Sequence, residues 1–140
     1  MEDRYREQNV EMIYKKMNVT EMTEFQNDAF NVVIDKALMD SMLCGENAIP
    51  VVEKMMKEVY RVTAPGGVFI IISNGDEQNR KMFFDQSVWE YKMLTIEKTS
   101  KMIALDENPK NYHYIYILTK KIVEQKEEEV KEEEKQEETK

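Results

Sequence analysis

The chain has 140 residues and a formal net charge of −8, and its length allows one domain with a real but modest core. Residues 122–140 hold nine Glu and four Lys, so this segment carries most of the net charge and leaves residues 1–121 only mildly acidic. That balance, with Lys and Arg scattered along the chain, argues against binding to nucleic acid or to an anionic membrane surface. Cys44 is the only cysteine, which excludes an intrachain disulfide and a multi-cysteine metal site and favours a reducing, cytoplasmic compartment.

The beginning of the chain is charged and lacks the apolar core of a signal peptide, and no apolar run approaches the roughly 18 residues of a membrane helix. From Val10 to Met17 apolar and polar residues alternate, which predicts a strand followed by Asn18 and Val19. After a polar connection, the apolar run Phe30 to Asp35 predicts a second strand, buried in a parallel sheet.

The spacing of apolar residues predicts an amphipathic helix over 48–62, with Asn47 as its N-cap and Pro50 in its first turn. The following Ala64-Pro-Gly-Gly67 predicts a turn that ends this helix, because proline disfavours helix in the residue before it. The run from Val68 to Ser73 is apolar almost throughout, so we expect a central strand there.

The remaining pattern predicts a short helix from Glu77 to Gln86 and two final strands, Trp89 to Thr99 and Tyr112 to Lys120. Their short connection, which contains Asn108-Pro109, favours an antiparallel hairpin at a sheet edge, because a parallel return needs a longer crossover. Residues 122–140 are a low-complexity Glu/Lys segment that we expect to be a disordered tail.

Three segments, residues 30–46, 56–70 and 108–117, resemble in order and spacing the motifs of class I S-adenosylmethionine-dependent methyltransferases, most closely those that modify lysines of translation elongation factor. Residues 30–46, FNVVIDKALMDSMLCGE, are similar to the family pattern F-D-V-V-[IL]-[DE]-K-G-T-[LF]-D-A-[LI]-L-x-G-E. Residues 56–70 resemble its M-L-x-E-[IV]-x-R-V-L-x-P-G-G segment, and residues 108–117 its closing strand. The resemblance implies an α/β, truncated Rossmann-like class I methyltransferase fold with a C-terminal antiparallel hairpin, within residues 1–121.

The resemblance also implies a cofactor, a substrate class and site residues. The cofactor would be S-adenosyl-L-methionine and the substrate a lysine of a protein. The adenine-contacting acid of the family falls on Asn18 and the next main-chain amide on Val19, while Lys36 falls on a cofactor-binding lysine. Methyl transfer requires an oriented, neutral amine, and the acids near the predicted site mouth are Asp35 and Asp40.

The departures from the family pattern concern the cofactor site. Asn18 replaces an Asp and has no charge to strengthen a hydrogen bond, and Ala37-Leu38 replaces Gly-Thr. The family's glycine-rich first strand and its second strand would precede Met1, which predicts an unpaired edge on the strand Phe30 to Asp35. We therefore expect weak or no activity of the isolated chain, or a partner chain that completes the sheet. A non-catalytic interaction subunit and an incomplete gene product are the alternatives.

Simpler structural roles compete with each functional interpretation. Asp35-Lys36 is also the charged pair expected at the end of a buried strand, and Asp40 is also a helix-capping or solvated acid. Cys44 has no identifiable base and fits a small loop residue. His113 lies in a predicted strand, where packing or edge exposure is the ordinary role.

Overall fold

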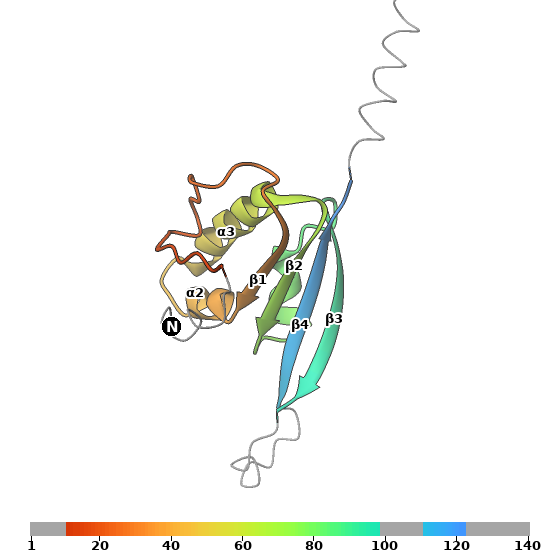
Figure 1. The fold of residues 1–140 in the computed structure, drawn as a ribbon. Helices are drawn as coiled ribbons and strands as arrows, with labels where there is room; N and C mark the ends of the chain where they lie inside the picture. The colour runs from red at the N-terminus through yellow and green to blue at the C-terminus, as the bar shows by residue number, and fades with distance from the viewer. Residues whose placement is uncertain (1–10, 99–110, 123–140) are drawn as a thin grey trace, which may run out of the picture.

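The computed structural model describes residues 11–98 and 111–122 of the chain. The strands are β1 (Phe30–Lys36), β2 (Thr63–Ser73), β3 (Trp89–Glu97) and β4 (Tyr112–Lys120). The helices are α2 (Leu38–Leu43), α3 (Ala48–Val62), α4 (Glu77–Arg80) and the 3₁₀ helix η2 (Lys81–Phe83). Figure 1 shows these strands as one twisted sheet, in the order β1-β2-β4-β3.

The sheet is mixed, and its pairing explains the order of the chain. β1 and β2 are parallel and are connected through α3, whereas β4 pairs antiparallel with both β2 and β3. The final hairpin and the central place of β2 are therefore confirmed, and the α/β fold class is that of a truncated Rossmann-like domain. β1 lies at one edge of the described sheet, as the sequence predicted.

Helix α3 has the predicted bounds and packs its apolar stripe on one face of the sheet. The apolar periodicity sets this arrangement, because the buried positions fall on a single side of the helix. Buried on that side are Val52, Met55, Met56, Val59 and Val62, which face a core that includes Phe69, Ile71, Trp89, Tyr116 and Leu118.

Asn47 is the N-cap residue of α3, as predicted, but its side chain does not cap the helix. Asn47 has φ +52°, a left-handed conformation, and its side chain accepts no hydrogen bond from the helix. An N-cap side chain reaches the first free N–H groups from extended backbone, so the left-handed conformation of Asn47 does not provide that geometry.

Two other predicted boundaries also shift. β2 begins at Thr63, directly after α3, and includes the Ala64-Pro-Gly-Gly67 segment that we predicted as a turn. Gly66 still takes a left-handed φ of +75°, and the β1–β2 register is irregular between Phe30 and Val32, so the bend is absorbed inside the strand. The predicted helix Glu77 to Gln86 is divided into α4 and η2 and ends at Phe83.

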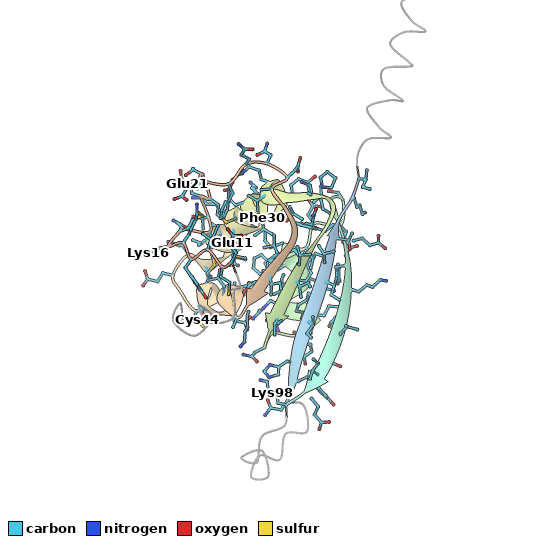
Figure 2. All side chains as sticks on the ribbon, viewed as in Figure 1. Glu11, Lys16, Glu21, Phe30, Cys44 and Lys98 are labelled. Atoms are coloured by element: carbon cyan, nitrogen blue, oxygen red, sulfur yellow. The ribbon has the colours of Figure 1, made fainter. Side chains whose placement is uncertain are left out.

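The predicted strand from Val10 to Met17 is wrong: residues 11–18 form no strand, and Val10 lies outside the described residues. Alternation alone cannot create a strand without a neighbour that accepts its main-chain hydrogen bonds, and the described sheet offers none at this place. The chain from 11 to 29 instead runs as irregular structure beside α3, with Lys16 and Glu21 exposed on it (Figure 2).

Two basic side chains fix part of this irregular segment. The Arg61 guanidinium donates to the carbonyl oxygens of Met22 at 2.9 Å and Phe25 at 2.8 Å. The Lys120 ammonium, which is almost buried, donates to Asp28 at 3.0 Å and to the carbonyl of Thr63 at 2.7 Å. These contacts fix the segment relative to α3 and β2 without secondary structure of its own.

The second face of the sheet, which we call the open face, points away from α3. It carries Val32 and Ile34 of β1 and, by register, Ile70, Ile117 and Leu94 of the other strands. Val32, Ile34 and Leu94 are each more than half exposed. Among the described helices, none is long and apolar enough to cross a membrane.

Candidate functional site

The candidate site lies where the parallel strands β1 and β2 end, because ligands in α/β sheets bind outside the carboxyl ends of such strands. Asp35 is the buried residue just before the end of β1. Its carboxylate accepts hydrogen bonds from the N–H groups of Leu38 at 2.7 Å and Met39 at 3.0 Å. Burial raises the pKa of Asp35, against the lowering effect of these two N–H groups. The Asp35 carboxylate thus caps α2 from within the strand.

The turn between β1 and α2 contains a strained residue. Ala37 has φ +65° and ψ 9°, a left-handed conformation in which an L side chain crowds its own backbone. The Ala37 N–H donates to the carbonyl of Ile72 at 3.0 Å, which keeps the turn against β2. The strained conformation directs the chain from β1 into the capped start of α2.

Asp40 lies at the centre of a polar cluster that joins the loops after β1 and β2. Its carboxylate accepts from the Arg80 guanidinium at 3.0 Å and from the Asn74 N–H at 2.8 Å. The Ser73 hydroxyl also donates to it in a short hydrogen bond. Asp40 and Arg80 are both largely shielded from solvent, so this ion pair is stronger than a pair on the open surface.

The cluster also determines the ionisation of Asp40. Burial acts to raise its pKa, but the Asn74 N–H, the Ser73 hydroxyl and the nearby Arg80 charge outweigh burial, so the pKa of Asp40 is lowered. Asp40 is therefore an ionised acid whose oxygens are engaged by three groups of the protein.

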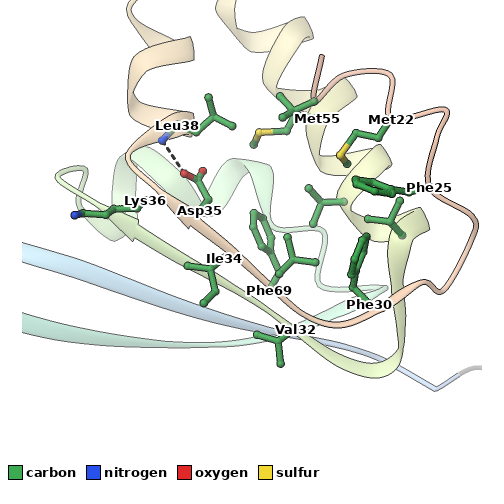
Figure 3. Close-up of a pocket in the computed structure, with 14 residues that line it drawn as sticks. Met22, Phe25, Phe30, Val32, Ile34, Asp35, Lys36, Leu38, Met55 and Phe69 are labelled. Atoms are coloured by element: carbon green, nitrogen blue, oxygen red, sulfur yellow. Dashed lines mark hydrogen bonds between the residues drawn. The ribbon is translucent and has the colours of Figure 1, made fainter. Parts of the chain in front are cut away.

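A hollow of about 370 Å³ runs along the outer edge of β1. Figure 3 shows Met22, Phe25, Phe30 and Met55 along its wall, and Asp35 with Lys36 at one end. The lining is mostly apolar, and among the described residues that form it only Asp35 and Lys36 are charged. The hollow also includes Val32 and Ile34, so it wraps around the edge of the strand onto the open face.

The structure brings together three of the residues predicted for the site. Val19, Asp35 and Lys36 line the same hollow, whereas Asn18 and Asp40 do not line it. The Asn18 side-chain oxygen accepts from the Thr20 N–H at 3.0 Å and from the Thr20 hydroxyl at 2.8 Å, which closes a local turn. Asp40 lies outside the hollow, in the cluster with Arg80.

Sequence reasoning missed the partners of Asp40. Ser73 is a polar residue that ends an apolar strand at its carboxyl end, and this position was a signal for a site residue. Arg80 carried no such signal, because only the folded chain brings it to Asp40, 40 positions earlier.

A family model described as a methyltransferase domain matches residues 2–137, nearly the whole chain. The chain belongs to the class I S-adenosylmethionine-dependent methyltransferase family. It is 36% identical over 75 residues to an eEF1A lysine and N-terminal methyltransferase from Bos taurus, and 28% identical over 78 residues to EEF1A lysine methyltransferase 4 from Mus musculus. These matches cover 52% and 50% of this chain but only 11% and 31% of those proteins.

Solved structures support the same methyltransferase fold. A SAM-dependent methyltransferase from Methanosarcina mazei aligns with a TM-score of 0.54 and 13% identity, over 77% of this chain and 66% of its own. A protein from work on thioacetal formation in echinomycin biosynthesis aligns with a TM-score of 0.66 and 11% identity, over 96% and 67%. Identities this low show the fold alone.

The described residues fit one part of S-adenosylmethionine. Lys36 is an exposed cation at the carboxyl end of β1 and can pair with a carboxylate, and the apolar wall of the hollow can take an aromatic ring. The ribose hydroxyls would need further acceptors, and the one carboxylate in the described lining, Asp35, is already engaged by two N–H groups. The described residues could therefore form one side of a cofactor site.

Proposed function

We propose that this chain takes part in S-adenosylmethionine-dependent methylation of a lysine side chain of a protein. One arrangement carries the proposal. The parallel strands β1 and β2 end side by side, and Asp40, which follows β1, accepts a hydrogen bond from the segment that follows β2. Lys36 lines the hollow beside these strand ends. The names of the relatives point to eEF1A as the acceptor. An exposed free thiol at Cys44 fits a cytoplasmic, reducing compartment.

Within this function we assign different roles to the predicted site residues. Lys36 would pair with the carboxylate of the cofactor, and Asn18 and Val19 would lie on its adenine side. Asp35 and Asp40 would act by positioning, since both carboxylates are engaged by main-chain N–H groups. The protein's contribution to the reaction would be orientation of the amine and the methyl group and exclusion of water.

Isothermal titration with S-adenosylmethionine tests this proposal. Because the described residues offer one side of the site, we expect the 140-residue chain to bind the cofactor only at millimolar concentration. Lys36→Met should abolish that binding, whereas Lys92→Met, which removes an exposed lysine from β3, should leave it unchanged. Low-micromolar binding to the isolated chain would overturn the incomplete-site argument. An equal loss of cofactor binding in both variants would show that Lys36 has no specific role in binding.

A second candidate function is a non-catalytic subunit, which the engaged carboxylates favour, as does the outer edge of β1, where no other described strand pairs. Such a subunit would bind another polypeptide and would not bind the cofactor. The titration separates the two candidates: no heat at millimolar cofactor, together with a stable protein complex, supports the subunit.

A further inference from the structure

The outer edge of β1 has main-chain groups without a partner among residues 11–98 and 111–122. The Ala37 N–H points to β2, where it meets the Ile72 carbonyl. Main-chain groups of a strand point alternately to its two sides, so those of Val33 and Asp35 also point to β2. The groups of Val32, Ile34 and Lys36 therefore point outward, where no described residue hydrogen-bonds to them. Such an edge is a template for another strand.

The surroundings of this edge suit an apolar strand. On one side lies the hollow, with Met22, Phe25 and Met55 in its wall (Figure 3). On the other side Val32 and Ile34 are 53% and 64% exposed. A strand laid against β1 would place alternate side chains in the hollow and beside Val32 and Ile34, so both of its faces should be apolar near the middle.

β1 itself has that pattern. Antiparallel pairing of β1 with a second β1, centred on Val33, overlaps the full strand Phe30–Lys36. It places Val32 opposite Ile34, Val33 opposite its own copy and Asn31 opposite Asp35, so like side chains face one another over the middle of the strand, while Phe30 faces Lys36 at its two ends. A shift of two residues would place the Asp35 carboxylate opposite Val33 in one direction and the Asn31 amide opposite Val33 in the other, and either polar group costs free energy near an apolar wall. The register is therefore specified by the side chains.

The main-chain geometry agrees with the same register. Val32 and Ile34 direct their hydrogen-bonding groups outward and would form the bonded pairs, while Val33 would face its symmetry mate as a non-bonded pair with Cα atoms about 4.5 Å apart. We propose that two copies of this chain associate through β1, antiparallel and about a two-fold axis at Val33. The two four-stranded sheets would then continue into one another. This pairing does not depend on methyl transfer.

Sedimentation of the full chain tests the pairing. We expect twice the chain mass of 16.7 kDa, and Ile34→Lys should return the protein to a monomer by placing two charges beside the axis. Ile96→Lys is the matched control, because Ile96 is 53% exposed on the same open face but lies on β3, at the other edge. Dissociation by both variants would indicate contact through the open face, and a monomer in the unmodified chain would overturn the proposal.

Cross-linking tests the register and does not depend on the folding of the lysine variants. In a Cys44→Ser background, Val33→Cys should form an intermolecular disulfide with diamide, because the paired Cα distance lies within disulfide range. Asn31→Cys should not, because its nearest symmetry mate lies four residues along the pair. Equal cross-linking at both positions, or none at Val33→Cys, would refute the register. If β1 pairs with a different polypeptide and not with a second copy, the Val33→Cys protein should remain monomeric.

Discussion

Replacement of Ala37 by glycine is expected to stabilise this protein. Ala37 has φ +65° and an exposed side chain, so the methyl group adds strain and contributes no packing. The left-handed conformation costs an L residue about 1–2 kcal/mol, while the extra freedom of glycine in the unfolded chain costs about 0.4–1 kcal/mol. The difference gives a gain of about 0.5–1 kcal/mol in the free energy of unfolding, which corresponds to a rise in Tm of about 2–8 °C for a domain of this size.

Urea unfolding followed by far-UV circular dichroism measures this gain. The matched control is Ala29→Gly, a second exposed alanine, which is not among the residues with positive φ. There the substitution relieves no strain, so it should lower the free energy of unfolding by about 0.4–1 kcal/mol. If Ala37→Gly also lowers stability, the strain assigned to the β1–α2 turn does not exist. A change in the slope with urea would instead report an altered unfolded state.

The polar contacts give three further predictions. The pKa of Asp35 is raised, so its contribution to stability falls as the pH rises above 3.8. The pKa of Asp40 is lowered, so its contribution is lost as the pH falls below 3.8. Asp40→Asn should therefore cost more stability at neutral pH than at about pH 3, with the opposite trend for Asp35→Asn, in urea titrations across pH. Gly75→Ala should cost about 1–2 kcal/mol, because its methyl group would occupy the place of the Arg80 guanidinium; a double-mutant cycle with Arg80→Ala should show coupling. Lys120→Met should cost about 2–3 kcal/mol in thermal unfolding, because its buried ammonium satisfies two main-chain carbonyls that would lose their partner; an unchanged Tm would contradict this.

The elements that the sequence predicted well are those whose pattern reflects contact with one surface. The apolar stripe of α3 and the apolar run of β2 face a core whatever lies beyond it, and the bounds of α3 followed from that stripe. The strand at 10–17 failed because pairing depends on a neighbour, and alternation does not reveal whether a neighbour is present. Asn47 does occupy the N-cap position of α3, but its left-handed conformation, which the residue type does not reveal, keeps its side chain from hydrogen-bonding the helix.

The candidate site was predictable in its position and less so in its contacts. Asp35 and Lys36 follow an apolar strand, and that position alone placed them at the carboxyl end of a sheet. Whether a carboxylate is free or engaged depends on groups brought from elsewhere. The Asp35 carboxylate accepts from the N–H groups of Leu38 and Met39, which follow it closely in the chain, so local sequence could have suggested this contact. Arg80 reaches Asp40 only through the tertiary fold.

The same strand carries both proposals, and this couples them. Lys36 lies at the carboxyl end of β1 and Val33 in its middle, and both line one hollow. A second copy paired along β1 would therefore bring its own side chains beside the place proposed for the cofactor. A ligand that binds the monomer and the β1-paired dimer with different affinities must shift the monomer–dimer equilibrium by the ratio of those affinities. Sedimentation in the presence and absence of S-adenosylmethionine thus measures whether the cofactor and the second copy compete for β1 or support one another.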